Sequence, residues 1–191
     1  KSKIILGGAL SIILIGLVWS ILGTDTNSKS GYHTHADFKV YLDNVPVDFA
    51  QEKYMTSVNK ILHIYVHLHD LEDQIIHHHK ENVTMKTFLE SIKIQFIDEC
   101  FILDSGESYC NENDKTLKMF VNGIKNTEME NYIFNDADRI LITYGNEREE
   151  IIQQQIDSVS DLACIQSGTC PERGEPSDES SCTSGLGCVT E

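Results

Sequence analysis

Histidine is the residue type in this chain whose spacing most clearly suggests chemistry. All eight histidines lie in two segments, residues 33–35 and 63–79. Polar rings alternate with aliphatic side chains at the start of the second segment: His63, Tyr65, His67 and His69 alternate with Leu62, Ile64, Val66 and Leu68. This period of two predicts a strand that carries an aliphatic face and a histidine face.

Two further runs predict neighbouring strands. Residues 70–74 resemble a turn, and residues 75–79 (IIHHH) then predict the return strand of a hairpin. An odd number of loop residues would bring His67 and His69 level with His77 and His79, whereas an even number would place His78 there. In the N-terminal run, His33, His35 and Asp37 share one face of a strand, opposite its apolar residues.

The three His-x-His pairs predict one site for a divalent transition metal, copper or zinc. Imidazole is the commonest ligand for both metals, and neutral nitrogen ligands suit calcium and magnesium poorly. The predicted ligands are His33, His35, His67, His69, His77 and His79, with Asp37 as a further candidate and His63 in a supporting position. The alternative is a set of imidazoles on a solvated sheet face that binds no metal.

The N-terminal segment predicts a membrane anchor. Residues 4–22 carry no charge. As a helix, this run is long enough to span a hydrocarbon core of about 30 Å. Lys1 and Lys3 precede this run, so we expect a cytoplasmic N-terminus and an extracytoplasmic C-terminal domain in the cell membrane. A cleaved signal peptide is the alternative, although its apolar run would be shorter. The expected divisions are an anchor over residues 1–23 and a linker over 24–31.

Residues 32–145 predict one α+β domain, with a β-grasp-like mixed sheet and one short helix. Asp43-Asn44 and Asn122-Gly123 are typical of tight hairpin turns. Apolar residues from Met85 to Ile92 follow helical spacing, and Thr84 can cap that helix. Residues 139–145 predict a buried strand. A polar helix over residues 146–163 and a cysteine-rich acidic tail over 164–191 follow.

The six cysteines predict disulfides in an oxidising compartment. Their spacing favours three local pairs, Cys100–Cys110, Cys164–Cys170 and Cys182–Cys188, although six cysteines permit fifteen pairings. A zinc site built from these cysteines is disfavoured because none has the short spacing that such sites use.

The charge balance restricts the partners. The chain has 30 acidic and 15 basic residues and a formal net charge of -15, which would repel nucleic-acid phosphates. The expected partners are the membrane and either a protein of a membrane complex or a second copy of the chain.

Several stretches together resemble a family of single-anchor extracytoplasmic proteins of archaea and small-genome bacteria. They are HTHADFKVYLDNVPVDFAQEKYM, VHLHD, IIHHHK, TMKTFLESI, CFILD, TLKMFVNG, DRILITYG and DLACIQSGTCPERG, and the resemblance covers residues 32–172. The resemblance implies a location and an architecture for this chain but does not predict an activity. Residues 118–145 are also similar to the end of small β-grasp ligand-binding domains.

Three functions therefore fit the sequence. The first is a membrane-tethered accessory or metal-handling subunit that binds copper or zinc. The second is a structural subunit of a membrane or surface assembly without metal. The third is a metal-dependent enzyme with an open coordination position, in which Glu72, Asp73 or Glu81 near the histidines would act as a base.

Overall fold

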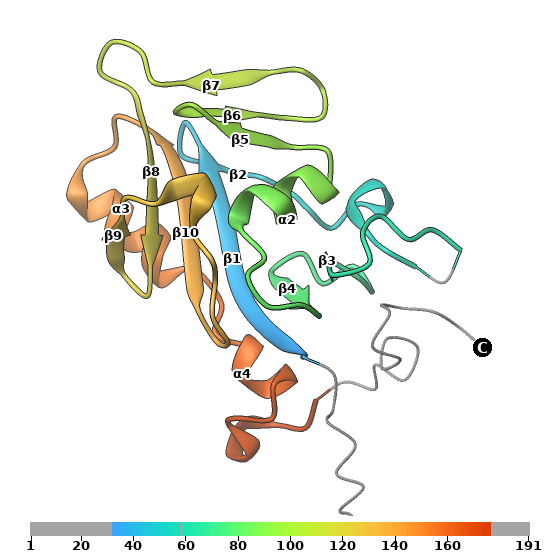
Figure 1. Cartoon of the computed structure of the whole chain (residues 1–191). Coiled ribbons are helices and arrows are strands. Elements are labelled where there is room, and N and C mark those ends of the chain that lie inside the picture. Colours follow the sequence, from blue (N-terminus) through green and yellow to red (C-terminus); the bar gives the residue numbers. More distant parts are fainter. Residues whose placement is uncertain (1–31, 58, 177–191) are drawn as a thin grey trace, which may run out of the picture. The chain divides into compact units, whose positions relative to one another are not determined.

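The computed structural model describes residues 32–57 and 59–176, and these residues form an α+β fold (Figure 1). A mixed seven-stranded sheet has the order β3-β4-β1-β10-β8-β9, with β2 paired to β1, and a three-stranded antiparallel sheet has the order β5-β6-β7. The strands of the large sheet are β1 (Thr34–Leu42), β2 (Val45–Pro46), β3 (Val66–His67), β4 (Ile75–His78), β8 (Thr116–Val121), β9 (Ile124–Asn126) and β10 (Arg139–Gly145). Those of the small sheet are β5 (Gln95–Ile97), β6 (Cys100–Ile102) and β7 (Ser108–Cys110).

The described helices are short. The α-helices are α2 (Met85–Ser91), α3 (Glu149–Asp157) and α4 (Ala163–Gln166), and the 3-10 turns are η1 (Glu52–Tyr54), η2 (Met129–Asn131) and η3 (Pro171–Arg173).

The large sheet is centred on two strands from opposite ends of the domain. β1 and β10 run parallel, and their register aligns Asp37 with Arg139 and Leu42 with Tyr144. The other strand pairs of this sheet are antiparallel. β10 lies at the centre and is buried almost throughout, which confirms the predicted buried strand over residues 139–145.

One face of β1 supplies the core. Ala36, Phe38 and Val40 are at most 1% exposed and belong to a single apolar cluster. The helix α2 contributes to the same cluster, because Met85, Phe88, Leu89 and Ile92 lie on one of its sides. The backbone N–H of Thr87 donates to Thr84 Oγ1 at 3.2 Å, so Thr84 caps this helix as predicted.

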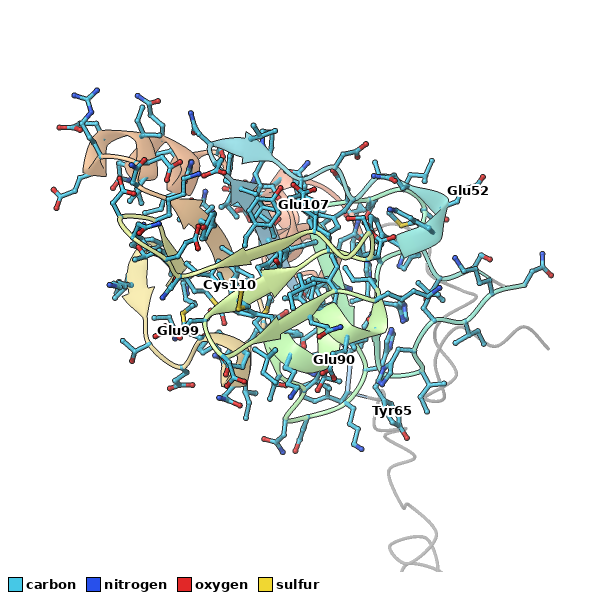
Figure 2. The ribbon with its side chains drawn as sticks, turned by 90° about the horizontal axis from the view of Figure 1, so that it is seen from above. Glu52, Tyr65, Glu90, Glu99, Glu107 and Cys110 are labelled. Atoms are coloured by element: carbon cyan, nitrogen blue, oxygen red, sulfur yellow. A yellow bond between two sulfur atoms is a disulfide. The ribbon has the colours of Figure 1, made fainter. Side chains whose placement is uncertain are left out.

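The predicted turns and two predicted disulfides are present. Asp43 and Asn44 have φ angles of 49° and 63°, and Asn122 and Gly123 have 52° and 79°, the conformation that a two-residue hairpin turn requires. Cys100 and Cys110 lie directly opposite each other on β6 and β7 and are bonded, with Cys110 labelled in Figure 2. Cys164 and Cys170 are also bonded.

Some predicted elements differ from the structure or lie outside it. The long strand predicted around His67 is reduced to β3, and Ile64, predicted to be in the core, is 42% exposed. The reason is that only Val66 and His67 of this run pair with β4. The predicted helix over residues 146–163 is interrupted, because α3 ends at Asp157 and α4 begins at Ala163.

Residues 1–31 and 177–191 fall outside the described part, and with them the predicted anchor and the pair Cys182–Cys188. Within residues 32–57 and 59–176, no helix has the length and apolarity to cross a membrane.

The second face of β1 is polar and is covered by the chain that follows β10. The carboxylate of Asp37 accepts hydrogen bonds from Ser160 Oγ at 2.6 Å, Leu162 N at 2.9 Å and Ala163 N at 3.0 Å. Its neighbour Arg139 donates to the carbonyls of Val159 and Ser160. The predicted metal-ligand candidate Asp37 therefore holds the start of α4 instead.

Replacement of Asp37 should loosen this covering segment. In Asp37→Asn, an amide N–H₂ would face backbone donors, and we expect the free energy of unfolding to fall by about 2–3 kcal/mol. Urea unfolding measures the change. The matched control is Glu81→Gln at an exposed carboxylate, which should shift stability by less than about 0.5 kcal/mol. Equal stability of the two variants would show that Asp37 does not hold the segment.

Candidate metal centre

The sheet register places the predicted histidines on one face. His35 of β1 lies opposite His77 of β4, and His67 of β3 also lies opposite His77. Directly opposed residues project to the same side of a sheet, so these three rings share a face. The odd-numbered loop alternative is thus the one that the structure adopts.

Three of the histidines form a group that could hold a metal ion. One ring nitrogen from each of His33, His35 and His77 lies within 4.8 Å of the others. The ring centroid of His35 is 4.5 Å from that of His33 and 4.7 Å from that of His77. His35 and His77 are buried, and His33 is half-buried.

The other three predicted ligands pack against this triad. His79 stacks on His33 with ring centroids 4.4 Å apart, and the ring centroids of His69 and His77 are 3.8 Å apart. The ring centroid of His67 is 5.0 Å from that of His79 and 6.0 Å from that of His77. The six predicted ligands therefore form one continuous cluster, of which the triad is the part with converging nitrogens.

Burial keeps His67 of this cluster neutral. His67 is 1% exposed, and its burial, followed by the neighbouring His77, His79 and His69, lowers the pKa of His67 to about 2. A neutral imidazole is the form that binds a metal, because protonation removes the lone pair. Burial therefore keeps His67 in the form that could bind a cation.

Two histidines lie elsewhere. His78 points to the core face, where its ring is 4.7 Å from that of Phe134, and burial lowers its pKa to about 4. His63 is half-buried, and its Nδ1 accepts the backbone N–H of Tyr65 at 3.2 Å. Burial also lowers the pKa of His63.

The residues that contact the ligand rings were not among the predicted site residues. Ser167 Oγ lies 2.8 Å from His35 Nδ1, and Asp70 Oδ2 lies 2.8 Å from His69 Nδ1. Asp70 could have been suspected because it follows His69 directly. Ser167 is far from the histidines in the sequence. No pattern of apolar residues around it predicts that this segment packs on the histidine face, so no sequence signal points to it.

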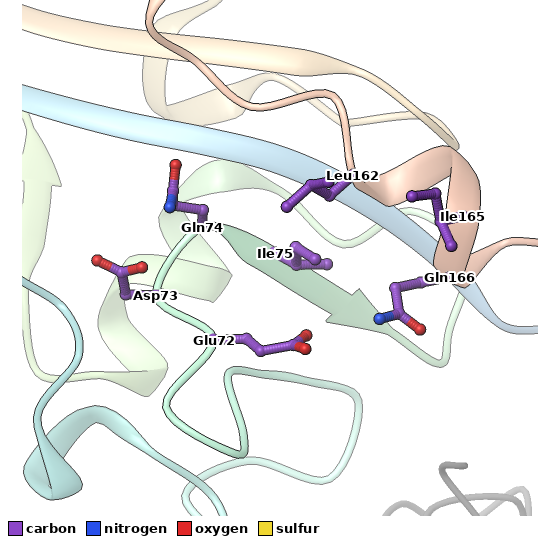
Figure 3. A pocket seen from close by; sticks show the side chains of 7 residues that line it. All are labelled: Glu72, Asp73, Gln74, Ile75, Leu162, Ile165 and Gln166. Carbon is purple, nitrogen blue, oxygen red and sulfur yellow. The ribbon is translucent and has the colours of Figure 1, made fainter. Parts of the chain in front are cut away.

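A cavity of about 180 Å³ lies between β4, which carries His77 of the cluster, and α4 (Figure 3). Its lining is apolar at Ile75, Leu162 and Ile165 and polar at Glu72, Asp73, Gln74 and Gln166. Ile75 precedes His77 by two residues on β4, and Gln166 of α4 precedes Ser167. The strand that lines this cavity therefore also carries His77, and the helix that lines it ends next to Ser167.

The ligand set decides which ions the site suits. Three imidazoles leave a fourth position open in a tetrahedral zinc site, and they also suit Cu(II). Calcium and magnesium need a shell of oxygen ligands, which the triad does not provide.

Comparison of the chain with protein-family models, with curated proteins and with solved structures finds no match.

Acid should destabilise the metal-free domain through His67 and His78. In the unfolded chain both side chains titrate near pH ~6.5, well above their pKa values of about 2 and about 4 in the folded domain. The unfolded state therefore takes up protons first, so the stabilisation is complete above that pH and falls as the pH drops towards 4. Urea midpoints at pH 8, 7 and 5 test this. We expect little change between 8 and 7 and a clear fall at 5; a constant midpoint would contradict it.

Proposed function

We propose that this protein is an extracytoplasmic domain that binds one divalent copper or zinc ion through His33, His35 and His77. We further propose that it serves as an accessory or metal-handling subunit at the membrane. The observation that carries this proposal is the convergence of three imidazole nitrogens within 4.8 Å at a largely buried position.

Two disulfides support the proposed compartment. Cys100–Cys110 and Cys164–Cys170 are bonded, and disulfides persist in oxidising surroundings outside the cytoplasm. The apolar run over residues 4–22 supports a single membrane anchor with a cytoplasmic N-terminus. Most of the histidine face is buried, but His33 and His79 at the edge of the cluster are only half-buried. A partner protein would therefore exchange metal with the site at this edge.

The strand arrangement supports a β-grasp-like domain. The first and last strands pair in parallel at the centre of the sheet, and α2 packs across one face.

A metal-dependent enzyme is the second candidate, favoured by one observation. The cavity that shares β4 with the triad is lined by Glu72 and Asp73, which could act as bases for a metal-bound water. Hydrolysis of a small ester or phosphate by the zinc-loaded protein would favour this candidate. If the protein bound no metal, a structural role in a membrane or surface assembly would be the remaining candidate.

Metal binding should depend on the triad. The purified full chain should bind about one equivalent of Zn²⁺ or Cu²⁺ in isothermal titration, and His35→Ala/His77→Ala should lose that binding because two of the three nitrogens are gone. His63→Ala is the matched control, since it removes a half-buried histidine outside the cluster, and it should bind as the wild type does.

Two results of this titration would contradict the proposal. One is a wild-type protein without binding, and the other is a double variant that binds as tightly as the control. The further variant His67→Ala/His69→Ala tests the outer members of the cluster, and we expect weaker binding because both rings pack beside His77 or His79.

The proposed topology has a separate test. Protease added to intact spheroplasts should digest the part of the chain after residue 31, while a cytoplasmic marker protein stays intact. Full protection of the domain until the membrane is dissolved would contradict an extracytoplasmic location.

A further inference from the structure

The side chain of Ser167 has one proton, and the structure gives that proton a defined acceptor. The hydroxyl of Ser167 donates to Asp136 Oδ1, and its oxygen lies 2.8 Å from His35 Nδ1. A hydroxyl has one donor, so once it donates to the carboxylate it can only accept from the imidazole. Nδ1 of His35 therefore carries the hydrogen, and Nε2 carries the lone pair that a metal needs.

The same carboxylate also holds the backbone of His35. The backbone N–H of His35 donates to Asp136 Oδ1 at 3.1 Å, and the N–H of Ala137 donates to the His35 carbonyl at 2.7 Å. Both the ring and the backbone of His35 are thus tied to the turn that precedes β10. Such contacts restrict the ring to one orientation.

Ser167 owes its own position to a loop closed by a disulfide. The N–H of Ser167 donates to the carbonyl of Ala163, and that of Thr169 donates to the carbonyl of Cys164, both at 2.9 Å. The bond Cys164–Cys170 closes the loop around Ser167. A single four-residue turn such as α4 is unstable in isolation, so this closure and the contact of α4 with Asp37 keep Ser167 beside His35.

We propose that Asp136 and Ser167, held by the Cys164–Cys170 loop, are positioning residues that select the Nδ1–H form of His35 and thereby set the affinity of the metal site. This inference rests on the proposed metal-binding function. It adds a dependence on the redox state of one disulfide: two thiols of a reductant supply two electrons and two protons, the reductant becomes a disulfide, and Cys164 and Cys170 become thiols. The opened loop then holds Ser167 less firmly, and metal affinity falls.

The test compares Ser167→Ala with Thr169→Ala in the full chain. Both variants remove a hydroxyl from the same disulfide loop, but the hydroxyl of Thr169 donates to the Cys164 carbonyl rather than contacting His35. Zn²⁺ affinity is measured by competition with a chromophoric chelator. We expect Ser167→Ala to bind about 10–100-fold more weakly than the wild type, as for other residues that orient a metal ligand, and Thr169→Ala to bind within about twofold.

Three more variants test the other contacts that position His35. Asp136→Asn should weaken binding in the same direction as Ser167→Ala, and Ser167→Thr, which keeps the hydroxyl, should restore affinity. Cys164→Ser/Cys170→Ser opens the loop without a thiol reductant, which would itself bind zinc, and should also weaken binding.

A second readout does not depend on metal. Nitrogen-15 NMR of the metal-free protein distinguishes the two neutral forms of an imidazole, and His35 should be in the Nδ1–H form in the wild type and in Thr169→Ala. In Ser167→Ala it should shift toward the Nε2–H form or a mixture.

An unchanged tautomer and unchanged affinity in Ser167→Ala would overturn the proposal, as would equal losses in both loop variants. If the wild-type protein bound no metal, the proposed function would fail, while the NMR comparison would still decide whether Ser167 selects the form of His35.

Discussion

A buried carboxylate on the central strand organises one whole side of this domain. Asp37 is 1% exposed, and it accepts three hydrogen bonds from the segment that leads into α4. Beside it in the register, Arg139 donates to two carbonyls of the same segment. A buried charge is costly unless it is hydrogen-bonded, so this face of the sheet is stable only while the C-terminal segment lies on it.

This covering explains the state of the histidines. Without it, the face of β1 that carries His35 would be solvated. Under the segment, His35 is buried and receives a hydrogen-bond partner from the covering chain itself. The chemistry of the cluster therefore depends on residues that follow the last strand of the sheet as much as on the strands that bear the histidines.

Local patterns predicted much of the fold. The alternation in β1, the hairpin turns at Asp43-Asn44 and Asn122-Gly123, the cap at Thr84 and two disulfide pairs depend on neighbouring residues, whose backbone preferences can be read directly from the sequence. The same alternation was misleading at Ile64, because the chain joins the sheet only after that residue and pairing with β4 is limited to Val66 and His67. The burial of the histidine face was also beyond prediction, since it depends on polar contacts between Asp37 and a distant segment that lacks a strong apolar face.

The parallel pairing of β1 with β10 has a consequence for how the chain reaches its folded state. The central contact of the sheet joins residues 37 and 139, so the entropy of closing nearly the whole domain must be overcome before the sheet can form. During synthesis, β1 has no parallel partner until residue 145 has left the ribosome, so the central pairing of the sheet forms late. The large sheet is therefore completed only at the end of the synthesis of this domain.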